Sequence, residues 1–301
     1  GPRGGHDRPV GRQGPQVGLM AMASRNAIKP HEFERPVLDL SGEILRAAMQ
    51  AMVTGSEEHG GIERYVDAVK LKSQMFRQAL VDNDIAELDL ETFKGLCAFM
   101  ATVRRRVSNW LNEDAFAELR PRIADLFDDA EHIDNRIGRF CDYFPNDKKH
   151  RWVRDLATEL LHNADPERVP LMNRWVWDAK ANTGVIREIW HGENVDAMTI
   201  PVGDGYGTYI MLREELSQFF SDNGVFKDVL FYVDVLCAQV YAQYICEQGG
   251  SYLRADFTAP EDPMQHTRRL LGLDGVQPGN GRTRLKSIDG EAYLLDDKHL
   301  N

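Results

Sequence analysis

The side chains with the widest chemical range gather between Leu161 and Gly192. Three of the chain's five tryptophans fall in this run, among arginines, acids and histidines. Large rings and guanidinium groups are enriched where proteins bind other molecules, because they combine buried area with directed hydrogen bonds. The candidate binding-surface residues here are Arg174, Trp175, Trp177, Asp178, Arg187, Glu188, Trp190 and His191.

Trp175 and Trp177 raise a geometric question. If residues 170–181 form a helix, as we predict, the two rings point about 200° apart, so one face cannot bury both. Two interpretations remain open. Either neighbouring helices cover both rings, or one ring faces a ligand or a partner.

A second group of candidates lies nearer the C-terminus. A helix is predicted over about 260–272, and cations near its start favour an anion, although Glu261 and Asp262 in the first turn favour ordinary capping. An enzyme would need this group to meet the 174–191 run, with His191 or His266 beside a carboxylate. The candidates in this second group are Arg254, Asp256, His266, Arg268 and Arg269.

One stretch has an outside likeness. Residues 159–162 (ELLH), 165–166 (DP) and 170–176 (PLMNRWV) resemble a segment of helical proteins related to the helix-hairpin-helix DNA glycosylases. The resemblance implies a helical fold acting on DNA, with a catalytic aspartate after the proline. Asn173 stands at that position and cannot act as a carboxylate base. The glycine-rich hairpin that grips DNA phosphate in that family is also missing, so no catalytic role is carried over.

Motifs for metals, cofactors and nucleophiles are not found. The sequence has no C-x-x-C, H-E-x-x-H, G-x-G-x-x-G or G-x-S-x-G pattern, so we expect neither a metal nor a cofactor. Residues 203–207 (GDGYG) have the wrong spacing for a phosphate loop and indicate a turn. Residues 104–106 (RRR) suit either phosphate or an acidic partner, or are simply solvated.

Composition and charge narrow the class. Of 301 residues, 43% are hydrophobic, and 47 acids against 36 basic residues give a net charge of −11. This acidity disfavours general nucleic-acid binding and indicates a soluble protein. We find no apolar run of about 18–20 residues and no signal-peptide pattern in residues 1–19, so we predict no membrane association. Isolated cysteines at Cys97, Cys141, Cys237 and Cys246 are typical of a cytoplasmic protein.

Apolar residues spaced three and four apart predict a mainly α fold, a multi-helix globular bundle. The strongest stripes run over 90–111, with Asp89 as N-cap, and over 226–245, which we place centrally. Two β-hairpins are predicted, a short internal one over about 197–211 and a C-terminal one over about 282–296. Further helices are expected over about 41–53, 61–81, 113–128, 130–143, 148–163, 170–181, 183–191, 212–222 and 260–272.

These elements suggest a disordered leader over 1–36 with Met20 or Met22 as an alternative start, a helical domain over 37–274, and a linker plus docked hairpin over 275–301. Three functions are compatible with the residues. The first is a non-catalytic assembly, accessory or regulatory factor that binds another protein. The second is an enzyme with a site assembled from the 174–191 and 251–269 segments. The third is a nucleic-acid-acting protein distantly like the helix-hairpin-helix glycosylases.

Overall fold

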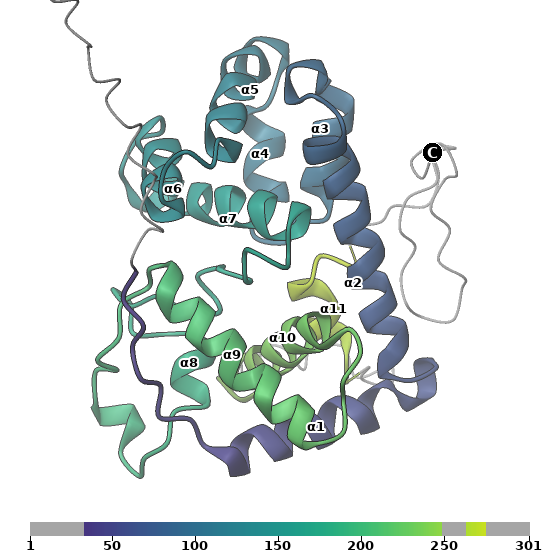
Figure 1. Cartoon of the computed structure of the whole chain (residues 1–301), viewed down its shortest axis with the longest axis vertical. Helices are drawn as coiled ribbons and strands as arrows, with labels where there is room; N and C mark the ends of the chain where they lie inside the picture. Colours follow the sequence, from purple (N-terminus) through teal and green to yellow (C-terminus); the bar gives the residue numbers. More distant parts are fainter. Residues whose placement is uncertain (1–32, 249–262, 275–301) are drawn as a thin grey trace, which may run out of the picture. The chain divides into compact units, whose positions relative to one another are not determined.

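The computed structural model describes residues 33–248 and 263–274. Within these ranges the chain is mainly helical, as predicted, and holds two isolated β-bridges but no β-strand (Figure 1). The α-helices are α1 (Gly42–Ser56), α2 (Ile62–Arg77), α3 (Leu90–Ala98), α4 (Arg104–Trp110), α5 (Glu113–Phe127), α6 (Ile133–Asp142), α7 (Trp152–Ala164), α8 (Val185–Glu188), α9 (Tyr206–Asp222), α10 (Val229–Gln248) and α11 (Gln265–Leu270).

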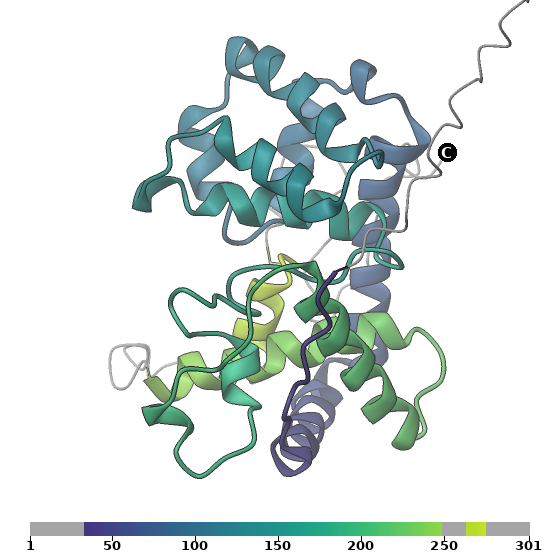
Figure 2. The ribbon, with the colours of Figure 1, turned by 60° about the vertical axis from the view of Figure 1, so that its left-hand side comes forward.

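The helices of the described part form two groups. Helices α3 to α7 lie together, and α1 with α8 to α11 make up the second group, while α2 runs alongside both (Figure 1). The turned view in Figure 2 shows the same division. Helix α7 packs against α2, α5 and α6, and α10 packs against α1, α2, α8, α9 and α11. Each group therefore has one central helix.

Helix α10 is the central helix that the 226–245 stripe predicts. By length and composition it is apolar enough to cross a membrane, which corrects our expectation that no run has that character. Half of the apolar stretch is buried inside the fold. Its contacts with five other helices are those of a core helix.

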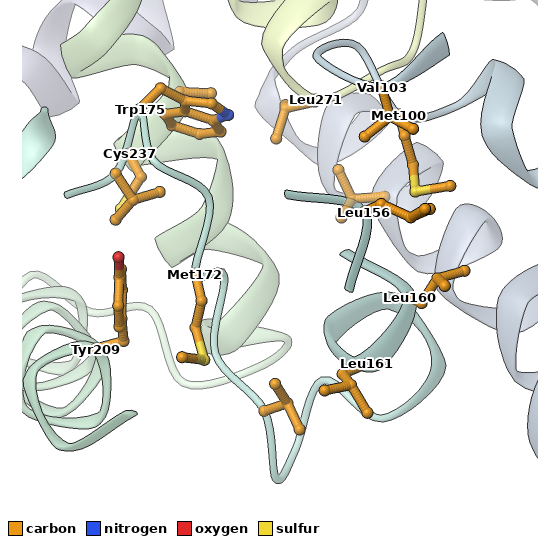
Figure 3. Packing of buried hydrophobic residues seen from close by; sticks show 14 of the residues in the cluster. Met100, Val103, Leu156, Leu160, Leu161, Met172, Trp175, Tyr209, Cys237 and Leu271 are labelled. Atoms are coloured by element: carbon orange, nitrogen blue, oxygen red, sulfur yellow. The ribbon is translucent and has the colours of Figure 1, made fainter. Parts of the chain in front are cut away.

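One hydrophobic cluster joins the two groups. Figure 3 shows Met172, Trp175 and Tyr209 gathered near Cys237 of α10, and Leu156 of α7 with Met100 and Val103. All of these side chains are nearly inaccessible to solvent and belong to the same buried cluster. Burial of this kind supplies most of the driving force for folding.

Helix α7 is buried on nearly all sides, and yet three of its buried side chains are ionisable. Every residue of α7 except Arg154 is buried. Asp155, Glu159 and His162 are spaced four and three residues apart, so they lie along one stripe of the helix. A buried charge is costly unless a partner compensates it, so each member of this stripe requires a partner from another segment.

Three different segments supply those partners. The backbone N–H and guanidinium of Arg174 donate to Asp155 at 2.9–3.2 Å. The amide of Asn173 donates to Glu159 Oε1 at 2.6 Å, and Lys72 Nζ of α2 lies 3.5 Å from Glu159 Oε2. Burial raises the pKa of Glu159 and lowers the pKa of Lys72.

His162 connects α7 to α10. Its Nδ1 lies 2.7 Å from the carbonyl oxygen of Val169, and its Nε2 lies 2.8 Å from Asp234 Oδ2. Only the imidazolium form donates from both nitrogens, so this geometry favours the charged ring. Burial has the largest single effect and lowers the pKa of His162, but the Asp234 carboxylate and the Val169 carbonyl together outweigh it, and the net shift is upward.

The helix predicted over 90–111 is broken. Asp89 caps α3 as predicted, accepting from the Thr92 N–H at 2.7 Å. The chain then turns at residues 99–103 before α4 begins. Gly272 packs against this turn so closely that a Cβ there would lie 1.8 Å from the Phe99 carbonyl oxygen. The apolar stripe continues through the break, and periodicity alone therefore does not reveal it.

The helix predicted over 170–181 is wrong. The carbonyls of Trp175 and Val176 accept hydrogen bonds from Val185 and Ile186, and the loop between them is closed by the Asp178–Thr183 bridge. Gly184 makes this closure possible, since its φ is +125° and a Cβ would lie 2.6 Å from the Val176 carbonyl oxygen. These carbonyls accept from N–H groups ten residues further along the chain instead of from the next turn of a helix.

The internal hairpin over 197–211 is also wrong, because residues 206–211 form the first turns of α9. The Tyr206 N–H at the start of that helix is held by the Asp134 carboxylate at 3.0 and 3.2 Å. Tyr209, Leu212 and Leu216 then form one buried helical face. The short apolar run that we interpreted as a strand is the start of this longer stripe.

Several predictions fall outside the described residues. These are the leader over 1–32, the linker and hairpin over 275–301, and the segment that contains Arg254 and Asp256. Residues 33–36, which we assigned to the leader, are described. The ring of Phe33 packs edge-on against Tyr206 with centroids 5.1 Å apart.

The His162–Asp234 pair predicts a pH-dependent stability. The folded pKa of His162 is raised, so between the unfolded value of about 6.5 and the folded value the native state binds more protons. The stabilisation is complete below about pH 6.5 and is lost as the pH rises through the folded pKa. The unfolding free energy of the wild type should therefore fall as the pH rises. Urea unfolding measured between about pH 6 and 9 should show a smaller fall in His162→Gln than in the wild type.

The exposed His191 is the matched control, and His191→Gln should keep the wild-type pH profile. Asp234→Asn leaves the ring without its carboxylate and should destabilise the protein by about 3–5 kcal/mol at pH 6. An unchanged profile in His162→Gln would show that this pair does not set the pH dependence.

Candidate functional site

A pocket with many charged side chains in its lining opens where α6 and the N-terminal end of α7 meet two loops. Its cavity volume is about 820 Å³. Helix α6 supplies one wall, the 145–154 segment a second, and the loops around Arg174 and Asp204 the remainder. The lining residues are Asp134, Ile137, Gly138, Cys141, Asp142, Pro145, Asn146, Asp147, Lys148, His150, Arg151, Val153, Arg154, Arg174, Asp178, Lys180, Asp204 and Gly205.

The local sequence explains the basic wall. Asp147 Oδ1 accepts from the N–H groups of Lys149 and His150 at 2.8 and 3.1 Å and so starts the turn that leads into α7. Arg151 and Arg154 follow three residues apart, on one side of the helix. A capped 3-10 turn directly before α7 therefore carries both guanidinium groups to the pocket.

Two of the pocket's arginines are occupied by carboxylates. Arg151 pairs with Asp178, whose Oδ1 also accepts from the Ala181 N–H at 3.0 Å. Arg174 is used by the buried Asp155. These two pairs attach the 173–181 loop to α7, so the pocket wall and the buried stripe share one loop.

Arg154 is the exception. It donates to the backbone carbonyl of Asp204 at 2.6 Å and lies close enough to Tyr209 to interact with it electrostatically. It forms no ion pair with any carboxylate in the described ranges, although it is partly buried. Arginine has five N–H donors, so the one neutral carbonyl acceptor leaves donor capacity beside the cavity.

Cys141 and His150 are the pocket's other reactive side chains. Burial raises the pKa of the Cys141 thiol to about 11, so the thiol is protonated at neutral pH and is a poor nucleophile. His150 Nδ1 lies 2.8 Å from Asp147 Oδ1, and this contact lowers the pKa of the Asp147 carboxyl. Such a contact is the usual way to orient a histidine base.

The described residues contain no group of three His, Cys, Asp or Glu side chains placed to hold a metal ion. The pocket's carboxylates are instead used individually. Asp134 accepts from the Tyr206 N–H, and Asp204 Oδ2 accepts from the Ala179 N–H at 3.2 Å. Both carboxylates therefore hold backbone groups of the pocket wall.

The fold covers all three tryptophans of the 174–191 run. Trp175 is 6% exposed, Trp177 0% and Trp190 6%. Trp177 donates from Nε1 to the carbonyls of Val202 and Gly203, and Trp175 packs against Tyr241. Of the two interpretations left open by the sequence, the one in which the fold buries both Trp175 and Trp177 is therefore correct.

The remaining predicted residues are dispersed. Arg174 and Asp178 line the pocket. Arg187 pairs with Asp196 at 3.1 Å and lies 3.9 Å from Glu188, and His191 is exposed, 3.7 Å from Asp39.

On α11, Arg268 is buried, Arg269 lies 3.7 Å from Asp274, and His266 is partly buried. None of these three residues lines the pocket. The described residues therefore do not bring the 174–191 and 263–274 segments together in this site.

Sequence reasoning missed the cations that matter most in the pocket. Lys148, Arg151, Arg154 and Lys180 were not among the candidates. A signal was present, because residues 148–154 (KKHRWVR) are strongly basic in a chain of net charge −11. We instead considered residues 104–106 as a site for phosphate or an acidic partner, but Arg104 pairs with Asp274 at 2.8 Å.

Comparisons with known proteins identify no family for this chain. No protein-family model matches the chain. No curated protein and no solved structure matches it either. The function must therefore be argued from the pocket itself.

Gly138 offers a probe of the pocket wall. A Cβ at this position in α6 meets no atom within 4 Å, so Gly138→Ala should stabilise the helix by about 0.5–1 kcal/mol. Gly184→Ala, in contrast, meets the Val176 carbonyl at positive φ and should destabilise by about 1 kcal/mol or more. Chemical denaturation of both variants measures the two changes in unfolding free energy. Equal changes would contradict the surroundings described for Gly138 and Gly184.

Proposed function

We propose that this chain is a cytoplasmic, non-catalytic helical protein that binds another protein in an assembly, accessory or regulatory role. We further propose that the pocket at the start of α7 is its contact site. The observation that carries this proposal is Arg154, a partly buried guanidinium beside an open cavity with no carboxylate partner among the described residues. Arginine is enriched at protein interfaces for this kind of bidentate recognition.

The pocket's lining supports a protein partner over a small apolar ligand. Small-molecule sites are mostly apolar with a few polar groups. Here ten of the lining residues are Asp, Lys or Arg, and they stand beside apolar residues such as Ile137 and Val153. A polar segment of a partner, with charges of its own, suits such a lining better.

The structure offers less support for nucleic-acid binding. A duplex needs several phosphates neutralised at once. In this pocket the number of lining carboxylates equals the number of lysines and arginines, so it does not form a cationic surface. Arg105 and Arg106 are exposed on α4, away from the pocket lining.

A second candidate function, an enzyme, rests on the hydrogen bond between His150 and Asp147 at the pocket. It differs from the site we predicted, since only Arg174 and Asp178 of those residues line the pocket. Asp147 also caps the adjacent turn, which accounts for its position without catalysis. If the pocket is catalytic, His150→Gln should abolish turnover of its substrate.

Site-specific photo-crosslinking tests the binding function. A photoreactive residue at Lys180, on the pocket rim, should capture a defined partner in the native cell when the full chain is expressed. Gly138→Leu places a bulky side chain in the cavity without removing a charge and should reduce that capture at least about tenfold, the loss expected for an interaction of about 1.4 kcal/mol.

Gly95→Leu is the matched control, because Gly95 is also a helical glycine facing open space but lies on α3, outside the pocket. A photoreactive residue at the exposed Lys94 controls for non-specific adducts. The binding function is refuted if Lys180 captures nothing, or if Gly138→Leu and Gly95→Leu capture equally.

A further inference from the structure

The charges that line the pocket are equal in number but differ in how they are engaged. Asp134 and Asp204 accept from backbone N–H groups, and Asp178 holds Arg151. Asp142 alone among the lining carboxylates has neither a backbone donor nor a basic partner in the described ranges. Nearly all the carboxylates are thus occupied.

The cations are less occupied. Arg151 and Arg174 hold carboxylates, but Lys148, Arg154 and Lys180 form no ion pair with the described residues. Of these three, the two lysines are exposed, and Arg154 is partly buried with its guanidinium oriented by the hydrogen bond to the Asp204 carbonyl. A guanidinium held in this way loses little freedom on binding, which favours it as the anchor.

The equal number of acidic and basic side chains in the lining favours an anion of low charge. Because the lining acids equal the lysines and arginines in number, a dianion such as phosphate would meet repulsion from the nearby carboxylates. A single monoanionic carboxylate suits the planar fork of a guanidinium, which binds it through two parallel hydrogen bonds. The open space over Gly138 admits the chain that carries the carboxylate.

Resting on the proposed function, we propose that the pocket recognises a carboxylate of the partner protein, seated on Arg154 with Lys148 and Lys180 at the rim. The carboxylate comes either from an acidic side chain or from the partner's C-terminus. Both sources present the same planar group, and their neighbours along the peptide differ.

NMR titration of the full chain with short peptides tests this inference. One probe is acetyl-Ala-Glu-Ala-amide, a second is acetyl-Ala-Ala-Ala with a free C-terminus, and acetyl-Ala-Gln-Ala-amide is the neutral control. We expect saturable shifts around Arg154 with at least one carboxylate probe and none with the neutral peptide. The tighter of the two carboxylate probes identifies the source.

Variants locate the anion. Arg154→Gln should weaken binding about tenfold, as expected for the loss of a charge-assisted hydrogen bond. Arg122→Gln is the matched control, since Arg122 is exposed and packs on the Tyr143 ring outside the pocket. If Arg154→Gln does not fold, Gly138→Leu blocks the same space with every charge retained and should also weaken binding.

Three results would overturn the inference: no carboxylate probe binds, Arg154→Gln binds as the wild type does, or inorganic phosphate binds more tightly than either peptide. Competition separates this inference from the binding function. If a saturating carboxylate peptide leaves partner capture at Lys180 intact, the carboxylate inference fails and the binding function stands. If the peptide binds through Arg154 while nothing is captured, the binding function fails and the carboxylate site stands.

Discussion

The structure depends on how one buried helix neutralises its own charges. Asp155, Glu159 and His162 lie along a single stripe of α7, a helix with no solvent-facing side except at Arg154. Three separate parts of the chain compensate these charges. The 173–174 segment contacts both Asp155 and Glu159, while Lys72 of α2 lies against Glu159 and Asp234 of α10 pairs with His162. Helix α7 therefore docks in one register and rotation, because any other leaves a buried charge unpaired.

This constraint also shapes the pocket. The loop that supplies Asn173 and Arg174 to the stripe continues to Asp178, which holds Arg151 at the pocket wall. The only residue of α7 that is not buried, Arg154, lines the same cavity. The pocket is thus anchored to the most constrained part of the core, which suits a site that must hold one guanidinium in a fixed position.

Such a stripe contributes specificity more than stability. An apolar α7 of similar shape could be as stable, because burying charges costs much of what their pairing returns. Removing one partner is another matter, since the remaining charge is left buried without compensation. Glu159 and Lys72 show this tension directly, as burial shifts both pKa values toward the neutral forms while their proximity opposes it.

The sequence by itself determined the helical class, the cap at Asp89 and the central place of α10, because these follow from local spacing and hydrogen bonding. Tertiary contacts decided the break near Phe99, the loop around Gly184 and the burial of Trp177, where distant backbone groups displace local ones. Tertiary contacts also decided the pocket. In the sequence, a stripe of charged residues resembles a solvated helix face until its partners are known, and those partners lie far away along the chain.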